Sequence, residues 1–209
     1  MPARIAGICG LVAFVTANIG WIAGGLAQPA AYSFANDDIS DLGADTANSS
    51  WIYNRIGANL TGLLLVALAL GLWRALSPEL LGRLGAAALL AVGAGLVLEG
   101  FFHLDCRGID SGCTNDSWHS HAHKIESGIT AAATFAAPLI LAFAFRRIPA
   151  WRDSWLPSLI TAPAIFLASL VFSSVGNGAS TRAGLVVFSL WIAFVGMRLL
   201  QKRDLPAAS

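Results

Sequence analysis

The feature that most constrains this chain is a series of six long apolar segments, each about 19–25 residues long. A helix of ~20 residues, rising ~1.5 Å per residue, crosses the ~30 Å hydrocarbon layer of a membrane. Charged residues make up only 12% of the chain, against ~25% in soluble domains. We therefore predict an all-α, polytopic membrane protein, folded as one six-helix bundle over residues 1–209. The predicted spans are residues 5–27, 52–76, 80–103, 122–145, 155–174 and 183–201.

The placement of basic residues predicts the orientation of the bundle. Nine of the thirteen Lys and Arg residues lie on one side of the predicted spans, and cytoplasmic loops carry such an excess. Both termini should therefore be cytoplasmic. The two long polar connections, residues 28–51 and 104–121, should form the outer face. The net charge of +1 and the lack of a basic patch give no indication of a nucleic-acid partner.

Two cysteines lie in the second long connection, with six residues between them. Outside the cytoplasm a disulfide can persist, so we predict a bond between Cys106 and Cys113, with two free thiols as the alternative. The third cysteine, Cys9, falls within the first span and is expected to serve packing.

Histidines and acids gather toward the predicted outer face. His119 and His123 are four residues apart at the start of the fourth span. If helical, they share a face, as two imidazoles on one metal ion do. Glu126 lies three residues further along the same face.

A second group of polar residues lies where the third span should end. Glu99 and His103 are four residues apart, and Asp105 follows as the chain leaves the membrane. A carboxylate buried in a membrane costs several kcal/mol unless it is paired or protonated, and is a functional-site hypothesis by default. Arg55, one turn into the second span, is the predicted partner of Glu99 or Glu126.

The first long connection contributes Ser40 and Asp41. Ser40 is placed to be the N-cap of a short helix. Alternatively, Ser40 and Asp41 fold over the cluster of histidines and acids, where a hydroxyl and a carboxylate would suit a hydrolytic site.

The order of several short motifs resembles the bacterial six-helix membrane family called domain of unknown function 998. The resemblance covers nearly the whole chain and places it in a bacterial cytoplasmic membrane. A looser similarity links the Ser, Asp and His-x-x-x-His pattern to the zinc-containing ceramidase and progestin-receptor-like membrane hydrolases, with a different helix number and motif order. The motifs are Pro29, Tyr32-Ser33, Ile39-Ser40-Asp41-Leu42-Gly43, Asn54, Gly57, Phe101-Phe102-His103-Leu104-Asp105-Cys106, His119 and His123.

Several functional hypotheses follow. The first is a metal-dependent hydrolase of a lipid-like substrate at the outer face. His119, His123 and Asp105, with His103 as a further candidate ligand, would hold zinc, and Glu126 or Asp41 would be the base, with Ser40 in a positioning role.

Three alternatives remain open at this point. Metal-free acid catalysis on a prenyl or other lipid chain would use a protonated Glu99, Glu126 or Asp105. A non-catalytic module would bind lipid or sense pH through its histidines. In the simplest case the acids, histidines and Arg55 only satisfy one another as a polar cap. The expected partner is a lipid or isoprenoid-like small molecule, and the sequence does not indicate an oligomeric state.

Overall fold

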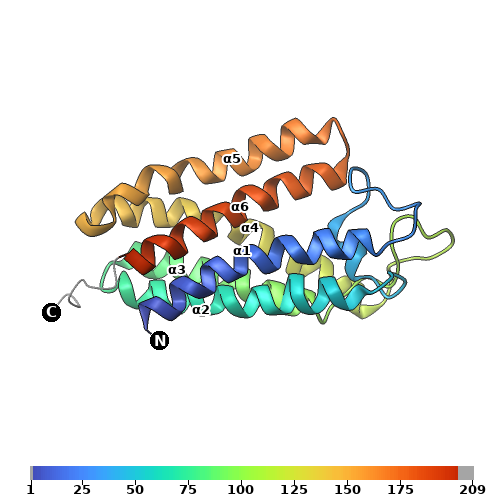
Figure 1. Cartoon of the computed structure of the whole chain (residues 1–209), viewed down its shortest axis with the longest axis horizontal. Coiled ribbons are helices and arrows are strands. Elements are labelled where there is room, and N and C mark those ends of the chain that lie inside the picture. Colours follow the sequence, from blue (N-terminus) through green and yellow to red (C-terminus); the bar gives the residue numbers. More distant parts are fainter. Residues whose placement is uncertain (1, 202–209) are drawn as a thin grey trace.

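The computed structural model describes residues 2–201 and shows six long helices packed in a ring (Figure 1). Each helix contacts its neighbours in sequence, and the last closes the ring against the first. The start of the first helix and the end of the last lie at one end of the bundle, here called the terminal end (Figure 1). Residues 27–51 and 100–117 lie at the opposite end, here called the loop end (Figure 1). The helices are α1 (Ala3–Leu26), α2 (Thr61–Ala75), α3 (Leu80–Glu99), α4 (Trp118–Arg147), α5 (Trp155–Ser173) and α6 (Asn177–Gln201).

Within the described residues, six helices are long and apolar enough to cross a membrane. The predicted all-α, six-span architecture is confirmed at this level. The outward faces of the helices are apolar, as Ile5, Val12 and Ile19 on α1 illustrate, with 40–50% of each side chain exposed. A surface of this kind needs lipid around it, because exposed apolar patches of this extent are rare on soluble monomers.

Two helix ends at the loop end differ from the predicted spans. Helix α3 ends at Glu99, four residues before the predicted end, and the chain turns away after Gly100 at the C-cap. The predicted end of the third span at residue 103 is therefore wrong, and Glu99 and His103 do not lie on one helix. Helix α4 starts at Trp118 instead of residue 122, because the Ser117 side chain caps it by accepting a hydrogen bond from the Ser120 backbone N–H at 3.1 Å.

The second span begins with a π-helix, η2 (Ile52–Leu60), which continues directly into α2. Such wide turns are rare and often found at functional sites. Two short 3₁₀ helices, η1 (Ile39–Gly43) and η3 (Pro149–Ser154), lie in connections. Asp38 occupies the N-cap position of η1, so the prediction of Ser40 as an N-cap is wrong. Helix α6 begins six residues before the predicted start of the sixth span, directly after Gly176.

The centre of the ring is filled toward the terminal end and open toward the loop end. Leu72, Leu141 and Phe145 are completely buried between α2, α3 and α4 near the terminal end. Toward the loop end, smaller side chains line the centre and leave a cavity. The ring arrangement thus places an interior space close to the polar residues of the loop end.

Candidate functional site

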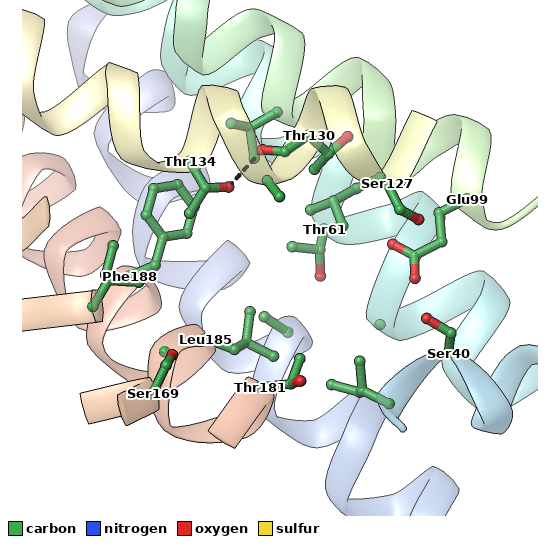
Figure 2. Close-up of a pocket in the computed structure, with 18 of the residues that line it drawn as sticks. Ser40, Thr61, Glu99, Ser127, Thr130, Thr134, Ser169, Thr181, Leu185 and Phe188 are labelled. Carbon is green, nitrogen blue, oxygen red and sulfur yellow. Dashed lines mark hydrogen bonds between the residues drawn. The ribbon is translucent and has the colours of Figure 1, made fainter. Parts of the chain in front are cut away.

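The cavity has a volume of about 420 Å³ and is lined by residues of all six spans and of η1. Pockets that bind small molecules typically measure about 300–1,000 Å³. Most of the lining is apolar, with Leu96, Ile165, Leu185 and Phe188 among its residues. Figure 2 shows Ser40, Glu99 and Ser127 pointing into one end of the cavity, while Leu185 and Phe188 lie toward the other. The lining of the cavity is therefore amphipathic, with the Glu99 carboxyl group and the Ser40 and Ser127 hydroxyl groups at one end.

Most other hydroxyl groups of the lining are hydrogen-bonded within the protein. The Thr134 hydroxyl donates to the Thr130 carbonyl at 2.9 Å (Figure 2), and the Ser180 hydroxyl donates to the Ser169 carbonyl at 2.8 Å. The Thr61 hydroxyl is within 2.7 Å of the Thr16 hydroxyl. These groups make local bonds of a kind that is common in helices. The unusual polar groups are those around the two buried glutamates.

Glu99 and Glu126 are both buried, at 9% and 6% exposure. The Tyr53 hydroxyl donates to Glu99 Oε1 at 2.7 Å. Glu126 accepts from the hydroxyls of Ser127 at 3.0 Å and Thr130 at 3.3 Å. Each carboxyl group thus has neutral hydroxyl partners in place of a cation.

Gly95 on α3 provides the room for the Thr130 side chain, because a Cβ atom at this position would overlap Thr130 Oγ1. The same Cβ atom would lie 3.4 Å from Glu126 Oε2, an ordinary contact distance. The carboxyl group of Glu126 therefore packs against α3 one turn before Glu99. The two glutamates, predicted from sequence as members of one cluster, do occupy neighbouring turns of adjacent helices.

The buried His123 imidazole contacts both Glu126 and Ser127. Its Nδ1 atom is 3.0 Å from the Phe102 carbonyl oxygen and 3.4 Å from Glu126 Oε1, and its Nε2 atom is 3.4 Å from Ser127 Oγ. Because a carbonyl oxygen only accepts, Nδ1 carries the proton in this arrangement and Nε2 has a free lone pair. The imidazole can therefore accept a proton from the Ser127 side.

The other two predicted imidazole ligands belong to a different cluster. The rings of His103 and His119 stack at 5.8 Å between centroids, and the Trp118 ring lies 3.8 Å from that of His119. His103 Nδ1 is 3.0 Å from Asp45 Oδ1. His119 and His123 thus sit on one helix, as expected, but contact different groups.

Asp105 is held by the start of α4. Its carboxylate accepts hydrogen bonds from the backbone N–H of Ser117 at 3.0 Å and from the Ser117 hydroxyl, and these bonds lower the pKa of Asp105. Among residues 2–201, no group of three or more His, Cys, Asp and Glu side chains is placed to hold a metal ion. The donor set predicted for zinc is therefore not assembled in this structure, and the zinc site stays a prediction.

Ser40 and Asp41 lie in η1, which roofs the cavity. Ser40 lines it, whereas Asp41 is buried behind and its Oδ1 atom accepts from the Gly108 backbone N–H at 3.1 Å. Burial raises the pKa of Asp41, and the negative charges of Asp38 and Asp37 act in the same direction. Of this pair, only Ser40 reaches the cavity.

The two long connections are tied to each other over the cavity. Cys106 and Cys113 form the predicted disulfide, which encloses Gly108, the donor to Asp41. The Arg107 backbone N–H donates to the Thr46 hydroxyl at 3.2 Å, and the Asp45 backbone N–H donates to the Leu104 carbonyl at 3.0 Å. The second connection thereby holds η1 in place.

Two arginines behave differently from the sequence-based expectation. Arg55 is exposed, donates to Asn59 at 2.8 Å and lies over the Phe101 ring, so its predicted pairing with Glu99 or Glu126 is wrong. The π-helix turns Tyr53, not Arg55, toward Glu99. Arg182 on α6, which we did not predict as important, is buried and donates to the carbonyls of Phe34 at 3.0 Å and Asp37 at 2.8 Å.

Sequence reasoning also missed Tyr53 and Ser127. A signal for Ser127 exists, because it is four residues after His123 and follows Glu126, so the helical spacing used for the histidines would have included it. Tyr53 had no such signal, since its contact with Glu99 joins residues 46 positions apart.

No curated protein and no solved structure matches this chain. The family model described as a protein of unknown function, DUF998, matches residues 8–198. With nearly its whole length matched, and with six apolar helices long enough to cross a membrane, this chain belongs to the DUF998 family.

Proposed function

We propose that this protein is a membrane-embedded hydrolase that binds a lipid-like substrate in the central cavity and acts on it by metal-independent acid–base catalysis. The proposal rests on one observation: an apolar cavity and a group of proton-exchanging side chains lie next to each other. A largely apolar cavity of about 420 Å³ ends at Glu99 and Ser127, with His123 and Glu126 buried directly behind Ser127. An apolar chain fits the first environment, and a bond susceptible to proton transfer fits the second.

The cost of burying these groups favours a chemical role. Two carboxyl groups and an imidazole in the membrane region are expensive unless they serve a purpose, and such residues mark substrate or proton pathways by default. A purely structural polar cap has no need of space beside its carboxyl groups. Here Glu99 lines a cavity of ligand size.

The roles follow from the contacts. His123, with Nδ1 held by the Phe102 carbonyl, presents Nε2 as a general base. Glu99, hydrogen-bonded by Tyr53, can exchange a proton with a group at the polar end of the cavity. Asp105, Asp41 and Arg55 neither line the cavity nor bond to a side chain that lines it, because their partners are Ser117, Gly108 and Asn59. We assign them no part in the reaction.

The lining bears on the alternatives. A cyclase that works through carbocations needs a cavity poor in nucleophiles, whereas Ser40, Thr130 and Ser169 bring hydroxyl groups into this one. A non-catalytic lipid-binding protein remains the second candidate, since the amphipathic cavity alone would suffice for binding.

The orientation is part of the proposal. The excess of basic residues on the side of the termini favours cytoplasmic termini and a site toward the outer face of a bacterial cytoplasmic membrane. A reporter fused to the C-terminus, active only in the cytoplasm, checks this. Activity of a periplasm-only reporter at that position would contradict it.

The decisive experiment uses the purified protein in detergent and a panel of lipid esters and amides. We expect turnover that persists in a metal chelator and falls about 100-fold or more in His123→Ala, as for loss of a general base. His121→Ala is the matched control, because His121 is exposed and its ring bonds to the Ser117 carbonyl of its own helix turn at 2.8 Å.

Two outcomes contradict the proposal. Bound lipid without turnover of any panel member would support the binding module instead. Activity lost in chelator and restored by zinc would support the metal-dependent hydrolase expected from sequence.

A further inference from the structure

We infer that Ser127 is a nucleophile, that His123 is its base, and that the substrate is therefore a long-chain carboxylic ester. The inference rests on the proposed function and deepens it. The proposed function leaves open whether water attacks the substrate directly or a side chain attacks first. The inference assigns a covalent step to a residue that lines the cavity.

Among the hydroxyl residues of the described spans, Ser127 is distinguished by an imidazole nitrogen beside its hydroxyl group. Thr134, Thr181 and Ser173 each donate to a backbone carbonyl of the preceding turn. Ser127 Oγ lies 3.0 Å from Glu126 Oε1 and 3.4 Å from His123 Nε2. Both of these partners can take a proton, which is the condition for activating a hydroxyl group.

A carboxylate, an imidazole and a hydroxyl group meet here, and Glu126 Oε1, which accepts from the Ser127 hydroxyl at 3.0 Å, also approaches the imidazole. Glu126 Oε1 is 3.4 Å from His123 Nδ1, and His123 Nε2 faces Ser127 Oγ. The Phe102 carbonyl, 3.0 Å from the same Nδ1, fixes the tautomer that leaves Nε2 unprotonated. All three side chains come from one helical stretch, at positions i, i+3 and i+4, so α4 alone holds them in register.

Access separates Ser127 from its neighbours. Ser127 lines the cavity and points into it beside Glu99 (Figure 2). His123 and Glu126 are buried at 5% and 6% exposure. A bound molecule therefore reaches the hydroxyl group while the base remains shielded behind it.

The reaction proceeds in two balanced steps. Ser127 Oγ bonds to the carbonyl carbon of the ester while its proton passes to His123 Nε2. The bond from that carbon to the alkoxy oxygen then breaks, and the alcohol leaves with the proton from His123. Water next adds to the acyl-serine, giving one proton to His123. Cleavage of the acyl-serine bond releases the carboxylic acid, and the same proton returns to Ser127.

The cavity selects the substrate class. Its apolar part, at Leu185 and Phe188, accepts the acyl chain, and its polar end at Ser40 and Glu99 receives the ester group (Figure 2). Ser40 offers a neutral hydroxyl donor to the developing oxyanion at this end.

The test is covalent labelling of the purified full chain with a long-chain alkyl fluorophosphonate, read by peptide mass spectrometry. We expect one adduct, on Ser127. It should be absent in Ser127→Ala and Ser127→Cys, and form about 100-fold more slowly in His123→Ala. It should be unchanged in Ser173→Ala, because Ser173 is an exposed serine of α5 whose hydroxyl donates to the Leu170 carbonyl at 2.7 Å. Melting curves of each variant verify folding, and the thiol of Ser127→Cys keeps the local packing if the alanine variant does not fold.

The outcomes separate the two levels of the proposal. Wild-type protein that hydrolyses esters but carries no adduct on Ser127, or keeps its rate in Ser127→Ala, overturns the nucleophile and leaves the hydrolase. Wild-type protein with neither adduct nor hydrolysis overturns both.

Discussion

The terminal end and the loop end of this bundle are held together in different ways. At the terminal end, glycines let helices touch: a Cβ atom on Gly7 of α1 would lie 2.7 Å from the Gly196 carbonyl oxygen of α6. At the loop end, Arg182 of α6 instead donates to the carbonyls of Phe34 and Asp37 in the first long connection. The terminal end also carries two partly exposed ion pairs, Arg147 with Glu79 and Arg198 with Asp153. The loop end is distinguished by the hydrogen bonds of the buried Arg182 and by the disulfide.

This difference between the two ends explains why the cavity lies toward the loop end. In lipid, apolar helices gain little by associating unless their surfaces fit closely, so small residues drive packing. Close packing leaves no internal space, as the completely buried Leu72, Leu141 and Phe145 show. Polar ties between loops bring the chain together without filling the centre, and the space near Glu99 and Ser127 persists.

The largest expected effect is at the loop end. Arg182→Met removes a buried guanidinium that serves two backbone carbonyls and the Tyr32 hydroxyl. Hydrogen bonds from charged donors contribute about 1.5–3 kcal/mol each, so we expect a loss of about 3 kcal/mol or more, measured by thermal unfolding in detergent.

Arg55→Met is the matched control for Arg182→Met. Arg55 is exposed, and within residues 2–201 its guanidinium donates to Asn59 and lies over the Phe101 ring, so its loss should cost less than about 1 kcal/mol. Equal effects of the two substitutions would show that the first connection is not anchored through Arg182.

A smaller effect is expected at the terminal end. Gly7→Ala places a methyl group against the Gly196 carbonyl oxygen, which cannot yield without moving α6. Overpacking of this kind costs about 1–3 kcal/mol, which we expect as a lower melting temperature. Gly128→Ala is the control, because a Cβ atom there meets nothing within 4 Å. A destabilised control or an unaffected Gly7→Ala would refute packing by shape.

The smallest effect concerns the roof of the cavity and its pH dependence. Asp41 has a raised pKa because it is buried near Asp37, Asp38 and Asp110. The folded state therefore holds its proton more tightly than the unfolded chain, and this contribution to stability is lost as pH rises above the ordinary value of 3.8.

Asp41→Asn keeps an oxygen acceptor for the Gly108 backbone N–H and removes the charge. The melting temperature of the variant relative to wild type should increase as pH rises from about 4 to 7. A difference that stays constant with pH, or decreases, would contradict the assignment.

The sequence predicted most of the fold and part of the candidate site. The six spans and the Cys106–Cys113 disulfide were correct, because both depend on local chain properties. The predicted end of the third span at residue 103 and the predicted start of the fourth span at residue 122 were wrong. A C-cap at Gly100 and an N-cap at Ser117 set these helix ends instead of hydropathy. The predicted partner of the glutamates failed because η2 turns Arg55 outward.

The amino-acid order alone indicates a membrane bundle with acids, histidines and a hydroxyl group at regular spacing on one helix. Helical periodicity is enough to place His123, Glu126 and Ser127 together. Three features are visible only in the folded structure. Helix α6 closes the ring on α1, Tyr53 contacts Glu99, and a cavity lies beside Ser127. These features join residues far apart in the chain, and they depend on how closely six helices can approach.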